Sequence, residues 1–223
     1  MAKTSSQFDP TVVDAASLYS AGEAIAERFG RTKVTLEYTR LRDCLEQIRR
    51  EHKWRPASLN TIVLSIDPNS EGQQRFQTML SRSGFEPDVV HYRDTFVSAP
   101  PGRTPSETAS KPTVSLAPRL AYITGLMSRH QDPHFLVVTH SFELYGPLTD
   151  LAHRVPSGKI GIAYFASLLD YRWKTTGLLD NLPKGPGELR FFDLDPFGKE
   201  LVDVDLAGTS SGPSEARAGL SRF

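Results

Sequence analysis

The sequence is poor in cysteine and has no long apolar run. Cys44 is the only cysteine, so no disulfide can form within the chain, as is typical of a reducing compartment. Its helical spacing with Leu41, Leu45 and Ile48 favours a small core residue over a nucleophile. No stretch approaches the roughly 18 consecutive apolar residues of a membrane span, and the opening MAKTSSQFDP lacks the apolar core of a secretory signal. We therefore expect a cytoplasmic protein with no membrane association.

Several ligand-binding motifs are absent as well. The chain contains no GxxxxGK[ST] loop, no GxGxxG turn after a strand and no GxSxG elbow. It also lacks the paired-cysteine or histidine-rich spacing of a structural zinc site. These absences argue against NTPases, dinucleotide-dependent dehydrogenases, α/β hydrolases and zinc modules.

Positive and negative charges balance over the whole chain but not locally. The 26 Lys and Arg residues oppose 26 Asp and Glu residues, which argues against broad electrostatic binding of nucleic acid. Residues 28–55 nevertheless hold nine basic side chains against four acidic ones. This stretch is either a solvated helix face or a phosphate-binding edge, for which the candidates are Arg40, Arg42, Arg49, Arg50 and Lys53.

Apolar periodicity predicts alternating strands and helices. Strands are expected at 34–38, 61–66, 88–92, 135–139 and 159–165, with helices between them and a further helix at 11–29. Crossovers of this length favour parallel pairing, so we predict a three-layer α/β sandwich with a mostly parallel five-stranded sheet and a Rossmann-like topology. Residues 189–194 and 200–206 flank a Pro-Phe-Gly-Lys turn and are expected to form a C-terminal hairpin.

The predicted domain organisation has three parts. Residues 1–30 form an N-terminal tail and helix, 31–176 the α/β domain, and 177–223 a partly disordered C-terminal extension. The proline-rich stretch 97–113 is expected to be a mobile surface loop within the domain.

Candidate site residues follow from where the predicted strands end. Ligands of an open α/β sheet bind beyond the carboxyl ends of its strands, which places Glu37, Asp67, His140, Ser141 and Glu143 at the expected edge. Each also has a structural explanation. Asp67 suits a turn, Ser141 and Glu143 suit a helix start, and His140 suits a hydrogen-bonded core position. Glu37 is harder to explain this way, because a carboxylate ending a central strand is unfavourable unless it is paired or bound to a metal.

The order of segments resembles the NYN branch of the PIN-like nuclease superfamily. That family opens with a strand ending in an acid and followed by a helix, matched here to VTLEYTRL at 34–41. It continues with a strand, a helix and a "GF" strand, matched to TIVLSIDPNS and SGFEPDVVHY. Its most recognisable segment is a strand, an acidic turn, a Pro-Leu helix and a Gly-Lys strand, matched to FLVVTHSFELYGPLTDLAHRVPSGKIGIAYF at 135–165.

The resemblance implies a ribonuclease fold whose members hold Mg²⁺ or Mn²⁺ with clustered aspartates. Here the matching positions carry Glu37, Ser141 and Glu143, and Val114-Ser115 stands where the family has a valine-aspartate pair. The leading hypothesis is therefore a degenerate domain that binds RNA or a protein partner without an intact metal site. The alternative is a Mg²⁺- or Mn²⁺-dependent ribonuclease with Glu37, Glu143 and Asp67 as metal ligands and His140 or Ser141 orienting water. A small-molecule enzyme is a third hypothesis, and a homo-oligomer stays open.

Overall fold

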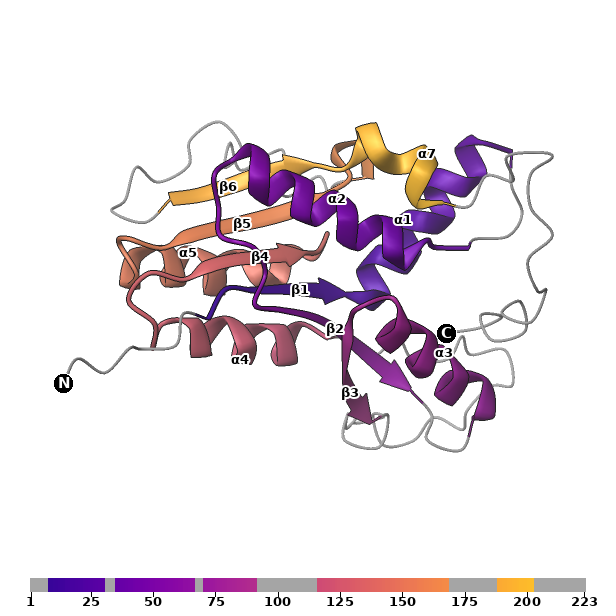
Figure 1. The fold of residues 1–223 in the computed structure, drawn as a ribbon, viewed down its shortest axis with the longest axis horizontal. Coiled ribbons are helices and arrows are strands. Elements are labelled where there is room, and N and C mark those ends of the chain that lie inside the picture. The colour runs from indigo at the N-terminus through magenta and orange to yellow at the C-terminus, as the bar shows by residue number, and fades with distance from the viewer. Residues whose placement is uncertain (1–7, 31–34, 67–69, 92–115, 169–187, 203–223) are drawn as a thin grey trace, which may run out of the picture.

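The computed structural model describes residues 8–30, 35–66, 70–91, 116–168 and 188–202. In these ranges six strands form one sheet, and every neighbouring pair is parallel (Figure 1). Their order across the sheet is β3-β2-β1-β4-β5-β6. The strands are β1 (Pro10–Asp14), β2 (Leu59–Ile66), β3 (Glu86–His91), β4 (His134–Val138), β5 (Lys159–Tyr164) and β6 (Glu188–Asp193). The protein is thus an α/β protein with a Rossmann-like sheet of six strands, one more than expected.

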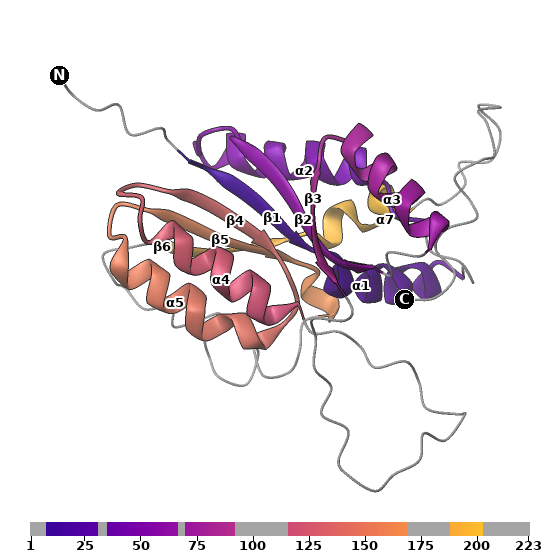
Figure 2. The same ribbon diagram turned by 90° about the horizontal axis from the view of Figure 1, so that it is seen from below.

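Helices cover both faces of this sheet (Figure 2). One face carries α1 (Ala15–Arg28), α2 (Tyr38–Glu51), α3 (Glu71–Arg82) and the short α7 (Gly198–Leu201), whose buried side chains share one core cluster. The other face carries α4 (Ala117–Met127) and α5 (Tyr145–Arg154), which share a second cluster. Short 3₁₀ turns at Phe142–Leu144, Ala166–Leu168 and Asp195–Phe197 follow β4, β5 and β6. The expected three-layer arrangement is confirmed.

The central strand β1 was missed by the prediction of one helix over 11–29. All five residues of β1 are buried, between β2 on one side and β4 on the other. The β-branched Thr11-Val12-Val13 run favours the extended chain, and the helix begins only after Asp14. The Asp14 side chain caps α1 by accepting a hydrogen bond from the Ser17 backbone N–H at 3.1 Å. The strand and the helix therefore follow each other without a loop, so in the sequence their apolar residues look like one continuous helical pattern.

The predicted strand at 34–38 does not join the sheet. Residues 31–34 lie outside the described ranges, Leu36 makes an isolated antiparallel bridge with Val202, and α2 begins at Tyr38. Leu36 and Tyr38 are nevertheless buried, because they pack in the helical layer. Alternating burial here reflects helix packing and not a sheet ladder. The other four predicted strands correspond to β2, β3, β4 and β5 and are confirmed.

The predicted C-terminal hairpin is also wrong. Its first half is β6, which pairs in parallel with β5 at the edge of the sheet. After β6 the 3₁₀ turn at Asp195–Phe197 leads into α7, which contacts α1 and α2 (Figure 1). The chain therefore crosses to the helical layer and does not fold back along β6. Residues 203–223 and the expected loop 97–113 lie outside the described residues.

Two expectations about single features can be compared with the structure. Cys44 is buried in the core of α2, and burial raises the pKa of its thiol to about 12, which keeps it protonated. None of the helices in the described ranges combines the length and the apolar character that a membrane crossing requires.

Candidate functional site

The order of the strands places the switch point of the sheet, where α/β proteins commonly have their ligand crevice, between β1 and β4. From β1 the chain runs into α1 on one face of the sheet, and from β4 it runs through Phe142–Leu144 into α5 on the other face. The connections therefore diverge at the carboxyl ends of two neighbouring strands. In open α/β sheets this is the position where ligands bind.

Asp14 is the acidic residue at this point. It ends β1 with only 4% of its surface exposed, and both of its carboxylate oxygens accept hydrogen bonds. Oδ1 accepts from the Ser17 N–H, and Oδ2 accepts from the hydroxyl of the buried Thr139 at 3.0 Å. Burial raises the pKa of Asp14 above its ordinary value, these hydrogen bonds oppose the rise, and the nearby Glu143 carboxylate adds to it.

The Glu143 carboxylate thus adds to the raised pKa of Asp14 from the turn that follows β4. Its side chain is exposed, in the 3₁₀ turn Phe142–Leu144. Ser141 precedes the turn, and its backbone N–H donates to the Thr139 hydroxyl at 3.1 Å. The Thr139 hydroxyl therefore links the Asp14 carboxylate to the start of the turn that carries Glu143. The Glu143 carboxylate therefore lies near enough to add to the pKa rise of Asp14, and Asp14 was not a predicted site residue.

His140 is held in a single neutral form beside this crevice. Its Nε2 accepts a hydrogen bond from the Phe165 backbone N–H at 3.0 Å, so Nε2 carries no proton. The proton is then on Nδ1, which donates to the Ser17 hydroxyl oxygen at 2.8 Å. The same oxygen accepts from the His140 backbone N–H at 2.6 Å. Burial lowers the pKa of His140 to about 4, in agreement with a neutral ring.

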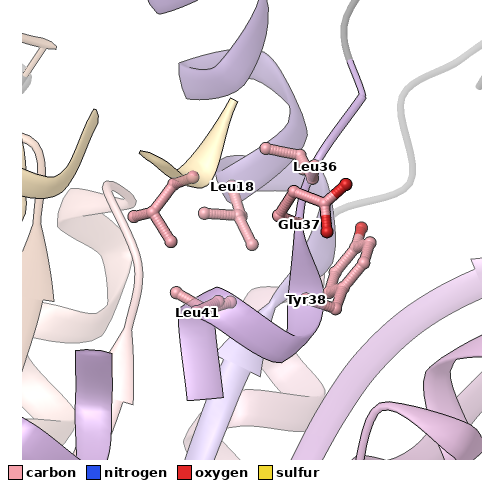
Figure 3. A pocket seen from close by; sticks show the side chains of 6 residues that line it. Leu18, Leu36, Glu37, Tyr38 and Leu41 are labelled. Carbon is pink, nitrogen blue, oxygen red and sulfur yellow. The ribbon is translucent and has the colours of Figure 1, made fainter. Parts of the chain in front are cut away.

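Glu37 lies elsewhere, at the start of α2. Its side chain is exposed, and its backbone N–H donates to the Leu201 carbonyl oxygen at 2.9 Å. It lines a shallow apolar hollow between α1, α2 and α7, together with Leu18, Leu36, Tyr38, Leu41 and Leu201. The Glu37 carboxylate sits at the rim, outside the group of leucine side chains (Figure 3). The expectation that Glu37 ends a central strand is corrected, because Asp14 occupies that place.

The predicted metal ligands are only partly covered by the structure. Asp67 lies outside the described residues. Within the described ranges, no three His, Cys, Asp or Glu side chains are grouped closely enough to share a metal ion. Of the described acidic residues, Glu143 is the one whose carboxylate adds to the raised pKa of Asp14.

The five predicted basic residues fall into three groups. Arg42 pairs with Asp43 at 2.9 Å and donates to the Ser83 carbonyl oxygen. Arg40, Arg50 and Lys53 are exposed, the first at the start of α2 and the other two at its end. Arg49 is wholly buried and does not face solvent.

Arg49 belongs to a charged network at the amino ends of β1 and β4. Its guanidinium donates to the Thr11 hydroxyl and to three backbone carbonyl oxygens, those of Pro10, Arg55 and His134. Burial lowers the pKa of Arg49 to about 10, so it stays charged at neutral pH. Its donors are directed at protein acceptors, so it does not present a charge to a nucleic acid.

Asp9 anchors the same network. Burial acts to raise the pKa of Asp9, but hydrogen bonds from Arg55 and His134 outweigh it and lower that pKa. Arg55 donates to both Asp9 oxygens at 2.7 Å, and the His134 backbone N–H donates at 2.9 Å. The Arg55 backbone N–H donates to His134 Nδ1 at 2.7 Å. These bonds tie β1, β4 and the loop after α2 together, at the edge opposite to Asp14.

Comparisons with protein-family models, with curated proteins and with solved structures found no match to this chain. The site is therefore interpreted from its own geometry.

Sequence reasoning missed Asp14 and Ser17. A signal for both exists, because Asp14 follows three β-branched residues and Ser17 stands three positions later, where a capping aspartate finds its N–H partner. Recognising that cap would have separated β1 from α1 and placed an acid at the end of the strand.

Proposed function

We propose that this chain is a nuclease-like domain of the NYN/PIN type that binds RNA at the carboxyl edge between β1 and β4. A divalent cation held by Asp14 and Glu143 would link the protein to an RNA phosphate. The observation that carries the proposal is the buried carboxylate of Asp14 at the switch point of the sheet, whose pKa is raised by burial and also by the nearby Glu143. Such a pair is unfavourable by itself and favourable around a cation.

The residues present suit Mg²⁺ or Mn²⁺. Mg²⁺ is commonly bound through one or two carboxylates, while waters and phosphate oxygens take its other positions. Burial and the neighbouring Glu143 both raise the pKa of Asp14, and a bound cation would offset both effects. The ion would supply positive charge for a phosphate. The chain itself would supply the two carboxylates and the rigid strand ends that hold them.

The hydrogen bonds of His140 favour binding over cleavage. A general base must accept a proton from water through a free lone pair. The lone pair of His140 Nε2 already accepts the Phe165 N–H, and its Nδ1 proton is directed at Ser17. His140 therefore positions the end of β4 and is not arranged to activate water.

The NYN-like layout supports the same proposal. The family opens with a strand that ends in an acid and continues into a helix, and β1, Asp14 and α1 have this arrangement. The acidic turn after β4 keeps Glu143. Asp14 also favours the second candidate function, a metal-dependent ribonuclease, because it restores the acid that the sequence prediction had assigned to Glu37.

Cation binding is the first property to test. Calorimetric titration of Mn²⁺ should show a site in the wild type that is lost in Asp14→Asn and in Glu143→Gln. Glu37→Gln is the matched control for Glu143→Gln, because it too removes an exposed glutamate carboxylate but at the start of α2, and it should bind as the wild type does. A wild type without Mn²⁺ binding, or loss of binding in Glu37→Gln alone, would refute the proposal.

RNA binding and cleavage are then separated with a labelled single-stranded oligouridylate. The proposal predicts tighter binding in Mn²⁺ than in EDTA, with no shortening of the RNA on a gel. Shortening by the wild type and not by Asp14→Asn would establish the ribonuclease alternative. Mn²⁺ binding without any RNA binding would direct the search to a protein partner.

A further inference from the structure

A cluster of basic side chains lies at the edge of the sheet opposite to Asp14. It is formed by the end of α2, the start of β5 and the middle of β6, and it is called the basic edge here. Its members are Arg50, His52, Lys53, Lys159 and Arg190.

Contacts across three elements hold these residues together. Lys159 Nζ donates to the Lys53 carbonyl oxygen at 3.2 Å, and Arg190 Nη1 donates to His52 Nδ1 at 3.0 Å. The Lys53 backbone N–H donates to the Arg50 carbonyl oxygen at 3.1 Å. Lys159 and Arg190 lie about 100 residues or more from α2 in sequence, so only the fold brings them to it.

Three of these cations have no carboxylate partner among the described residues. Arg50, Lys53 and Lys159 form no ion pair with a carboxylate in the part of the chain that the structure describes. Glu51 lies in the same turn of α2, and its carboxylate accepts a hydrogen bond from Gln47 at 2.8 Å. Like charges gathered without counter-ions repel each other, and an anionic polymer relieves that repulsion.

Lys53 occupies a backbone conformation that favours glycine. Its φ is 56°, and it is the residue with positive φ that ends α2. The Trp54 N–H donates to the Arg49 carbonyl oxygen and the Lys53 N–H to that of Arg50, which is the glycine-type helix ending. At this backbone conformation a lysine makes the folded protein less stable than a glycine would. Stability of the fold therefore does not account for a lysine at this position, and we look for a role of its charge.

We propose that the basic edge binds the phosphates of single-stranded RNA. This inference rests on the proposed function for the choice of RNA, but the surface is separate from the crevice between β1 and β4. Lysine and arginine side chains contact phosphates without reading sequence. The exposed His52 ring, which packs against Phe192 with ring centroids 4.8 Å apart, and the half-buried Arg190 guanidinium border the surface that unpaired bases would contact. The basic edge takes the place of the phosphate-binding edge that the sequence predicted along residues 28–55, because Arg42 and Arg49 bind groups within the protein.

The test measures salt dependence of binding by fluorescence anisotropy of a labelled oligouridylate, in EDTA so that the cation site contributes nothing. Two variants are compared, Arg50→Gln/Lys53→Gln and the control Arg82→Gln/Arg129→Gln. The control removes the same charge from exposed residues at the end of α3 and just after the end of α4, neither of which belongs to the basic edge.

Loss of two phosphate contacts should lower the slope of log K against log salt by about 1.4 and weaken binding about 25-fold at 0.1 M salt. The control should keep the wild-type slope. Equal slopes in the two variants would overturn the inference while leaving the Mn²⁺ result for Asp14 untouched. Tighter binding of duplex DNA than of the oligouridylate would overturn the assignment to single-stranded RNA. Absence of RNA binding in both EDTA and Mn²⁺ would overturn both proposals.

Discussion

Protonation of His140 should destabilise the protein in mild acid. The folded state holds a neutral ring with a pKa of about 4, whereas an unfolded histidine has a pKa near 6.5. The unfolded state therefore binds more protons between these values, and stability falls as pH decreases from 6.5 to 4. The difference corresponds to about 3 kcal/mol in full, of which about 2 kcal/mol is lost at pH 5.

The substitution His140→Gln isolates this effect. A glutamine keeps an acceptor for the Phe165 N–H but has no proton to gain, so this variant should lose about 2 kcal/mol less than the wild type between pH 7.5 and pH 5. Urea unfolding followed by circular dichroism at both pH values gives the two differences directly. His153→Gln, at an exposed position on α5, is the control and should follow the wild type.

Parallel loss of stability in the wild type and in His140→Gln would refute this reasoning. Because glutamine could perturb the site at both pH values, the ¹⁵N shifts of the His140 ring provide a second measurement. They should report the Nδ1–H tautomer at pH 7 and a titration midpoint well below 6. A midpoint near 6.5 would show that the ring is not held as its hydrogen bonds indicate.

Three further substitutions are expected to change stability in different directions. Because Asp14 has a raised pKa in the folded state, its carboxylate opposes folding above that pKa, so Asp14→Asn should stabilise the protein at pH 7.5 while removing Mn²⁺ binding; urea unfolding that shows a loss would contradict this. Arg49→Met removes the buried guanidinium that donates to three backbone carbonyl oxygens and should cost about 3 kcal/mol or more, against less than about 0.5 kcal/mol for the exposed neighbour in Arg50→Met. Lys53→Gly should raise stability by about 1 kcal/mol in thermal unfolding and weaken RNA binding, and a destabilised variant would exclude backbone strain at this position.

Most of the sheet could be predicted because its strands are long apolar runs. The runs that became β2, β4 and β5 are buried on both faces, and turn residues separate them from the helices that follow. β1 lacks that separation, since its last residue is already the cap of α1. Because β1 was not predicted, the acid expected at the end of the first strand was assigned to Glu37 and not to Asp14. A wrong strand boundary thus led to a wrong site residue.

The role of Arg49 could not be read from local sequence. It follows Leu45 by four positions and therefore lies on the buried face of α2, yet its basic neighbours made the stretch look like a charged surface. Its acceptors come from Pro10, Arg55 and His134, which are spread over more than 100 residues. Only the assembled sheet places these carbonyl groups around one guanidinium.

Some polar residues of this fold lie in surroundings that stabilise them, and others do not. We infer that the first serve the structure and the second serve a function. Asp9 has its pKa lowered by its partners, so its carboxylate stabilises the folded chain, and the Arg49 guanidinium is surrounded by acceptors although burial lowers its pKa. Asp14 has a raised pKa beside a second carboxylate, and Lys53 holds a conformation that glycine would adopt more readily. Local unfavourable features persist where function requires them. Asp14 lies at the carboxyl edge and Lys53 at the amino edge, which is why we assign the cation to the first and the RNA backbone to the second.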